Sequence, residues 1–393
     1  MRIKICKLLC IAFLFTTTVL KAQNVENVLN TIKQNNLEIQ AGKKFVESKS
    51  YEYRQENLPE GPELKYGYFP KNSSVPGTKE IFEVSQSFQI PGYYRNQKAY
   101  ADLMIEKEAY TQMIVQQDVL SKAKQLLIEY VYLRKKAAIN EKRLKFAEDT
   151  YNAYQVRLEV GDANALEVNK ARLHLMQVKK EEKNVRTSIL SINERLKALN
   201  GGIDIEISVN DYPNEMLVDL DSVIFEKLSV DPLLLAKKKA AAAAEKQWKV
   251  TKNLQLPKFS LGYGTETVAD ESFKGVLVGL SIPLWSSKRA IQKARIKTEY
   301  YDLSQTLLNK NMISETKIIY DQVTTLKENL TSYQTVLSSV NNQELLNMSL
   351  DSGDISIIEF FTEMFYYYEI YDEYLAVERE YYQELARLYK YKL

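Results

Sequence analysis

Two pairs of residues recur in this sequence at a constant offset of 192 residues, and no other feature limits the possible folds as strongly. The pairs are Ile90-Pro91, which returns as Ile282-Pro283, and Gly161-Asp162, which returns as Gly353-Asp354. In both copies the glycine follows the proline at a distance of 70 positions, and the interval between them reads as helix. A chain that contains two copies of one supersecondary unit is expected to have a duplicated architecture.

Residues 1–22 are predicted to be a secretory signal peptide. They combine a basic start, an apolar stretch over 8–20 and a small residue, Ala22, at the cleavage position. The apolar stretch is too short to cross a membrane as a helix. Both cysteines of the chain, Cys6 and Cys10, lie in this segment. The mature chain is therefore expected to have neither a disulfide nor a lipid anchor on cysteine.

Composition excludes several classes of function. Removal of residues 1–22 takes away four basic residues and no acidic one, which leaves 49 Lys and Arg against 51 Asp and Glu. A balanced surface of this kind does not favour nucleic acid as a partner. His174 is the only histidine, so a zinc or copper cluster is not expected. No phosphate-binding loop and no nucleophile with its base are recognisable, and we expect neither an enzyme nor a cofactor.

Four segments show the period-2 alternation of strands with one apolar and one polar face. They form two predicted hairpins, at about 62–90 and 257–283. The apolar positions of the first are Leu64, Tyr66, Tyr68, Phe82, Val84, Phe88 and Ile90; those of the second are Phe259, Leu261, Tyr263, Val276, Val278, Leu280 and Ile282. With about ten to twelve residues, each strand is long enough to cross a bilayer when tilted.

Two settings would suit such hairpins. They could be half-buried against helices in a soluble domain, or they could enter a membrane. An open sheet edge is not tolerated in lipid, and spanning barrels begin at about eight strands, so four strands cannot close alone. If the hairpins enter a membrane, several copies have to share one barrel, and three copies would supply twelve strands.

The predicted helices have matching lengths. Neither 93–160 nor 286–352 contains proline or glycine, and each would be roughly 100 Å long. Helices of that length form coiled coils or tubes. Four shorter helices are predicted at 24–57, 163–200, 222–253 (interrupted near Pro232) and 355–393. Stacked end to end in pairs, they would run antiparallel to the long helices and give four columns. For the aromatic residues of the last helix, packing between columns is favoured over a ligand site.

This order of elements resembles the TolC family of outer-membrane efflux and secretion channels over nearly the whole mature chain. Residues 154–173, YQVRLEVGDANALEVNKARL, are similar to the family's helix–turn–helix at the periplasmic tip, where an Arg-Leu pair precedes the turn glycine. The second copy, 348–363, is more degenerate, with Ser349 at the position of Arg157. The run 32–37, IKQNNL, is similar to the family's first helix but lacks its usual Asn-Pro, whereas Asp231-Pro232 is present in the second copy.

The resemblance implies a mainly α fold with membrane β-structure, built from a duplicated helix–β-hairpin–long helix–half helix unit. Three copies would form a twelve-stranded barrel in the outer membrane of a Gram-negative bacterium, continuous with an α-helical barrel in the periplasm. The expected parts are the signal peptide 1–22, a first repeat 23–200 with its tip at about 158–166, an equatorial linker 201–221, and a second repeat 222–393 with its tip at about 350–358.

The function that the resemblance implies is a passive trimeric exit duct for small molecules or metal cations. It would be driven by an inner-membrane transporter, expected to be proton-driven, through a periplasmic adaptor (a membrane fusion protein). Within the family the alternative is the duct of a type I protein secretion system. Outside the family the alternative is a soluble periplasmic coiled-coil adaptor or structural protein.

Three sets of residues are candidates for this function. The adaptor-docking tip would comprise Arg157, Leu158, Gly161, Leu166, Leu350, Gly353 and Ile358; helix capping explains the glycines equally well, and core packing the apolar residues. Threefold symmetry could turn Asp162, Asp351 and Asp354 into an acidic ring at the aperture; capping of the following helix is the alternative for Asp162 and Asp354. Pro91, Gly92 and Pro283 would mark the transition from strand to helix.

Overall fold

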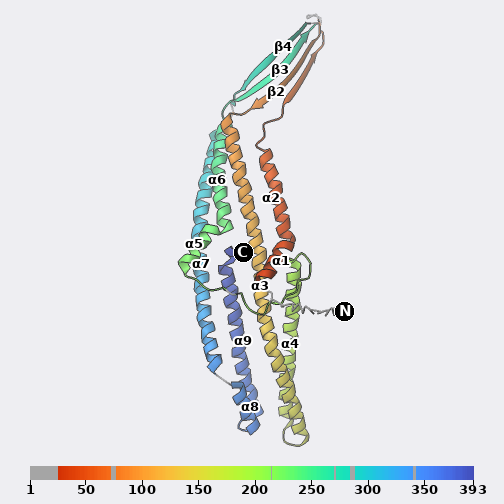
Figure 1. Cartoon of the computed structure of the whole chain (residues 1–393), viewed down its shortest axis with the longest axis vertical. Helices are drawn as coiled ribbons and strands as arrows, with labels where there is room; N and C mark the ends of the chain where they lie inside the picture. Colours follow the sequence, from red (N-terminus) through yellow and green to blue (C-terminus); the bar gives the residue numbers. More distant parts are fainter. Residues whose placement is uncertain (1–24, 72–76, 214, 270, 284–287, 340–341) are drawn as a thin grey trace, which may run out of the picture.

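The structure is a computed structural model that describes residues 25–71, 77–213, 215–269, 271–283, 288–339 and 342–393. The predicted signal peptide, 1–22, lies outside these residues. The molecule is long and narrow, with a sheet at one end and helices along the rest of its length (Figure 1). The C-terminus lies near the middle of the molecule.

The helices form four columns (Figure 1). Two columns are long and run away from the sheet: α3 (Pro91–Glu159), and α7 (Lys288–Ser339) followed by α8 (Asn342–Ser352). Each of the other two columns consists of shorter helices stacked end to end. In one of them α1 (Val25–Asn35) and α2 (Leu37–Gln55) lie above α4 (Ala165–Leu199). In the other α5 (Leu220–Val230) and α6 (Pro232–Asn253) lie above α9 (Ile357–Leu388), and a 3₁₀ turn, Lys390–Lys392, follows α9. This arrangement confirms the predicted end-to-end stacking. The second long helix was predicted to be continuous over 286–352, and residues 340–341, between α7 and α8, lie outside the described residues.

The columns stand in a fixed order. The helix α3 packs against α2 and α4 on one side and against α6 and α9 on the other, and α7 packs against α6 and α9. The two edges of the layer are therefore the column of α2 and α4 and the column of α7 and α8.

No helix within the described residues is long and apolar enough to cross a membrane.

Both stacked columns contain a helix break at the same backbone geometry. Asn36, between α1 and α2, has φ −64° and ψ 123°, and Asp231, between α5 and α6, has φ −60° and ψ 120°. Each side chain accepts a hydrogen bond from the backbone N–H of the following helix, at Ile39 and at Leu233 respectively. The prediction of one uninterrupted helix over 24–57 was wrong, because an asparagine cap breaks the helix without a proline.

The strands β1 (Glu63–Phe69), β2 (Lys79–Phe88), β3 (Lys258–Val268) and β4 (Glu271–Ser281) form a single antiparallel sheet in the order β1-β2-β3-β4. Both predicted hairpins are present, and the pairing of β2 with β3 joins them into one sheet, which the sequence did not indicate. With seven residues, β1 is shorter than the ten to twelve expected.

The two faces of the sheet differ in polarity. Leu64, Val84, Tyr263 and Val276 lie in register across all four strands, and all four are exposed. On the opposite face the neighbouring row contains Ser85 beside Gly262, where a Cβ on the glycine would lie 2.9 Å from the serine Cβ. The sheet projects beyond the ends of the helices (Figure 1). The alternative of hairpins half-buried against helices was wrong, because none of the described helices covers the apolar face.

The largest core lies at the equator, where α1, α3, α4 and the linker meet. Ile32, Leu127, Val131 and Leu196 have no exposed surface there, and each buried aliphatic side chain contributes about 1.5–3 kcal/mol. The linker crosses α3 between α4 and α5 (Figure 1). It is held there by the hydroxyl of Tyr130, which donates to the carbonyl of Ile207 (3.2 Å), and by an ion pair between Lys124 and Glu215.

Candidate functional site

The two tip turns have the same hydrogen-bonded geometry. Gly161 and Gly353 adopt left-handed φ values of 80° and 79°. In each turn the glycine N–H donates to the carbonyl three residues back, and the next N–H donates to the carbonyl five residues back: Gly161 to Leu158 (3.2 Å), Asp162 to Arg157 (2.8 Å), Gly353 to Leu350 (3.2 Å) and Asp354 to Ser349 (2.9 Å). These are Schellman caps. A Cβ at either glycine would meet nothing within 4 Å, so backbone conformation alone requires glycine.

The helices that follow the turns begin at other residues than the aspartates. Asn164 caps α4 and Ser356 caps α9, each in a capping box with Glu167 or Glu359. Hydrogen bonds from the backbone N–H and hydroxyl of Ser356 hold the pKa of Glu359 below its ordinary value. The capping alternative for Asp162 and Asp354 was therefore wrong, and capping does not occupy their carboxylates.

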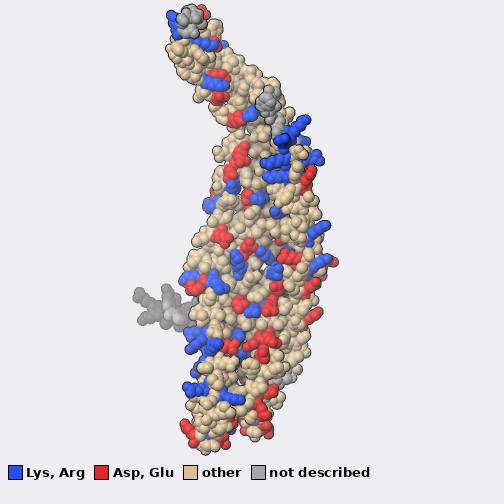
Figure 2. All heavy atoms as spheres, turned by 180° about the vertical axis from the view of Figure 1, so that it is seen from behind, with Lys and Arg blue, Asp and Glu red and all other residues tan. Residues whose placement is uncertain are grey.

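All three candidate aspartates are exposed at the tip. The Asp162 carboxylate lies 3.6 Å from the Arg157 guanidinium. The Asp354 carboxylate accepts a hydrogen bond from the hydroxyl of Ser352 at 2.6 Å. Asp351 is exposed on the last turn of α8. Figure 2 shows Asp and Glu side chains gathered at this end of the molecule. The tip of one subunit therefore presents acidic groups to solvent.

Apolar side chains surround both turns. Leu158, Leu166 and Ile358 are exposed, whereas Leu350 packs against the tip core, which includes Tyr154 and Phe360. Core packing accordingly explains Leu350 but none of the other three.

Sequence reasoning missed two further exposed side chains, Val160 (73 % exposed) and Met348 (62 % exposed). Val160 immediately precedes the turn glycine. An apolar residue directly before the turn glycine could have been recognised in the sequence as a candidate for the exposed tip.

The two tips differ in one supporting contact. The guanidinium of Arg157 lies over the ring of Tyr154, at 5.4 Å, and also reaches Asp162. In the second tip Ser349 takes the place of Arg157 and is too short to make either contact. Burial raises the pKa of Tyr154 above its ordinary value. The first turn is thus braced by a cation that the second turn lacks.

The transition from sheet to helix is well defined in the first repeat. Pro91 occupies the first helical position of α3, where its missing N–H costs nothing. The Tyr93 N–H donates to the carbonyl of Ile90 at 2.9 Å. A Cβ at Gly92 would make only an ordinary contact, 3.5 Å from the amide of Asn253. Pro283 lies two residues beyond the end of β4, and the residues after it, 284–287, lie outside the described part of the chain.

A polar cluster between α3, α4 and α9 was not found from the sequence. Arg143 is buried and donates to both carboxylate oxygens of Asp372, at 3.1 and 2.9 Å. Nearby, the ring of His174 lies 4.8 Å from that of Phe361, and its buried Nδ1 has no hydrogen-bond partner among the described residues. Burial, and then the charge of Arg143, lower the pKa of His174. The described residues contain no group of three or more His, Cys, Asp and Glu that could hold a metal ion.

The described residues thus form a row of four helical columns with an amphipathic sheet at one end and paired open turns at the other. The sequence model for outer membrane efflux proteins matches residues 28–202. The TolC-family resemblance is thereby confirmed, and the family is one of transport proteins and not of enzymes. The alternative of a soluble adaptor was wrong. No protein of curated function matches the sequence.

Solved channel structures share the fold. CusC, described in a study of transmembrane channel formation, is 15 % identical, with 94 % of this chain and 91 % of that chain covered and a TM-score of 0.77. The Campylobacter jejuni CmeC outer membrane channel is 14 % identical (94 % and 85 % covered, TM-score 0.77). The open Neisseria gonorrhoeae MtrE outer membrane channel is 13 % identical (94 % and 88 % covered, TM-score 0.72).

Proposed function

We propose that three copies of this chain form the outer membrane channel of a tripartite efflux system, a passive exit duct for small molecules or metal cations. The observation that carries this proposal is the sheet. One face is apolar and exposed across all four strands, the other is polar or glycine-rich, and β1 and β4 are edge strands. Such a sheet is stable in a bilayer only when its edges are paired by other copies.

The lateral edges of the helical layer support a closed ring. On α7 an exposed stripe of Ile296, Tyr300, Leu303 and Leu307 repeats at helical spacing. On the opposite edge of the layer, Phe45 of α2 and Leu173 and Met176 of α4 are exposed. Two different apolar edges on one subunit suit a head-to-tail contact, which gives a ring when the rotation closes. Three copies with twelve strands lie within the known range of spanning barrels.

Adaptor docking is proposed for the tip. Leu158, Leu166 and Ile358 expose apolar surface beside Gly161 and Gly353, which leave open space for an approaching helix. A periplasmic adaptor would bind here and couple the duct to an inner-membrane transporter, which we propose to be proton-driven. Leu158→Glu and Ile358→Glu should each weaken binding of an adaptor encoded in the same genome. Leu190 is exposed on α4 away from the turns, and Leu190→Glu should not weaken adaptor binding. An equal loss of adaptor binding in all three variants would refute the docking site.

The three tip aspartates are proposed to form acidic rings at the aperture. With threefold symmetry, Asp162, Asp351 and Asp354 would each appear three times and raise the local concentration of cations. The double variant Asp162→Asn with Asp354→Asn should shift the reversal potential of single channels toward anions in a salt gradient. Asp302→Asn, in the first third of α7 and far from the tip, serves as the control. An unchanged reversal potential in the double variant would exclude the rings.

The experiment that tests the channel itself is the native mass of the mature protein extracted from outer membranes in mild detergent. A mass of three chains is expected, because four strands cannot close. Recovery as a stable monomer, or in the soluble periplasmic fraction, would overturn the proposal.

A further inference from the structure

A basic groove lies in the upper half of the helical layer. It has a volume of about 380 Å³ and runs over α6, between α3 and α7. Ala240, Ala243 and Ala244 form its floor. The short alanine side chains recess α6 relative to its two neighbours, so the groove is a consequence of the alanine run at 240–244.

The rim of this groove is cationic. Lys107 comes from α3, and Lys293 and Lys297 come from α7. Tyr100 and Tyr301 complete the rim, and the described residues that line the groove include no carboxylate. Lys107 is paired with Glu108 at 2.8 Å, whereas no ion pair to Lys293 or Lys297 is found within the described part of the chain. Figure 2 shows Lys and Arg side chains concentrated where the helices meet the sheet. An anion would therefore find unneutralised charge here.

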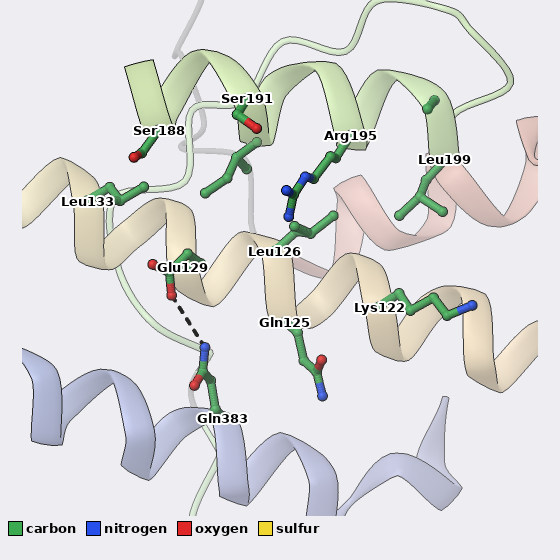
Figure 3. A pocket seen from close by; sticks show the side chains of 12 residues that line it. Lys122, Gln125, Leu126, Glu129, Leu133, Ser188, Ser191, Arg195, Leu199 and Gln383 are labelled. Atoms are coloured by element: carbon green, nitrogen blue, oxygen red, sulfur yellow. Dashed lines mark hydrogen bonds between the residues drawn. The ribbon is translucent and has the colours of Figure 1, made fainter. Parts of the chain in front are cut away.

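The groove lies on the face of the layer opposite the linker. On α3, Lys124 and Tyr130 bind the linker. Glu129 instead points to the other face, where it lines a larger cavity of about 750 Å³ and accepts a hydrogen bond from Gln383 of α9 (Figure 3). Lys107 and Glu129 are 22 residues apart, about six helical turns, so they point to the same face.

That face would line the duct. Three linkers on the inner face of a ring would cross its opening, so the linker marks the outer face and the basic groove the inner face. This placement rests on the function proposed above. In a trimer, three grooves would surround the lumen just below the barrel.

We propose that this groove binds anionic amphiphiles, molecules with an apolar body and a sulfonate, carboxylate or phosphate group, as they pass through the duct. The alanine floor and the tyrosine rings offer apolar contact, and the lysine ammonium groups bind the anion as mobile point charges. Anionic amphiphiles thereby become a substrate class of the channel. The three tip aspartates, whose negative charge would repel such anions, lie at the other end of the molecule, away from the groove.

Binding is tested with the intact trimer in phosphatidylcholine nanodiscs, using a naphthyl sulfonate and a naphthyl ammonium of the same size as probes. The sulfonate should bind more tightly. Lys293→Gln with Lys297→Gln should weaken its binding about tenfold or more, since hydrogen bonds to charged groups contribute about 1.5–3 kcal/mol each. Ala240→Leu should also weaken it, because the larger side chain fills the floor. Lys310→Gln, on another face of α7, should have no effect.

Three outcomes would overturn the inference: equal binding of the two probes, no effect of the double variant, or displacement of the sulfonate when phosphatidylglycerol is added to the nanodiscs. The last would assign the groove to membrane lipid instead of cargo.

Single-channel recording separates this inference from the proposed function. A wild-type trimer that does not conduct would overturn the channel and leave the binding data standing. A trimer that conducts but binds both probes equally would overturn only the groove.

Discussion

The two tip glycines carry the same rare backbone conformation, yet neither touches a neighbouring side chain. No steric contact would therefore prevent a Cβ at Gly161 or Gly353. A left-handed φ costs an L-residue roughly 1–2 kcal/mol, because its Cβ approaches the following carbonyl oxygen. The requirement at each turn is therefore energetic and local.

Gly161→Ala is expected to lower the free energy of unfolding by about 1–2 kcal/mol. Guanidinium unfolding of the detergent-solubilised protein measures the change. Gly61→Ala is the matched control, since Gly61 also has open space but no left-handed φ. An equal effect of the two substitutions would show that the conformational argument fails at the tip.

His174 should make stability depend on pH. Burial and Arg143 hold the folded pKa below the ordinary value of 6.5, so the unfolded chain binds the proton at a higher pH than the folded chain. The contribution of His174 to stability is fully present above about pH 6.5. It is lost as the pH falls toward the folded pKa, below which it changes no further.

His174→Phe keeps an aromatic ring against Phe361 and removes the titration. Between about pH 7.5 and about pH 5.5, the unfolding midpoint of the wild type should therefore fall further than that of the variant. Parallel midpoints over this range would contradict the assignment, because the chain has no other histidine.

At the scale of elements, the helix breaks show how one geometry is reached from two sequences. Asp231-Pro232 combines a cap with a residue that cannot continue a helix, whereas Asn36 achieves the same break with its cap alone. The amide of Asn36 also donates to the carbonyl of Leu199 at 2.8 Å. At Gly201, a Cβ would lie 2.6 Å from the carbonyl oxygen of Asn35. Contacts with the end of α4 thus replace the missing proline.

Leu37→Pro should be tolerated. Leu37 is the first residue of α2 and is exposed, and Asn36 already has the extended backbone that a following proline requires. We expect the free energy of unfolding to stay level or to rise by about 0.4–1 kcal/mol, because proline restricts the unfolded chain. Ile39→Pro, two residues further along, would remove the capped N–H and should destabilise strongly. A similar loss for both variants would refute the account of the break.

Helix lengths, strand positions and the repeat were accessible from the sequence because proline, glycine and apolar periodicity are local signals. The pairing of β2 with β3 was inaccessible, since it joins residues nearly 180 positions apart that share no pattern beyond alternation. The caps Asn164 and Ser356 were missed because Asp162 and Asp354, two residues earlier, are equally good capping residues by type. The cluster of Arg143, His174 and Asp372 required three helices to be placed before it could be seen.

At the scale of the whole molecule, we expect the edges of the helical layer to form the contacts of the proposed trimer. Leu303→Glu with Leu307→Glu places charges in the apolar stripe of α7 and should convert the trimer into monomers. Gln305→Glu, two residues from each leucine and therefore on the opposite side of the same helix, should leave the trimer intact. Light scattering in detergent measures both. A trimer that survives the double change would show that α7 does not form the contact between copies.

The single sheet has a consequence for the order of events during assembly. Because β2 pairs with β3 inside one chain, a single subunit can make three strand pairings without a partner. In the trimer proposed above, only the seam between β1 of one copy and β4 of the next would remain to be formed. Its closure would require three subunits to meet, so the rate at which finished channels appear should rise more steeply than in proportion to the amount of chain synthesised.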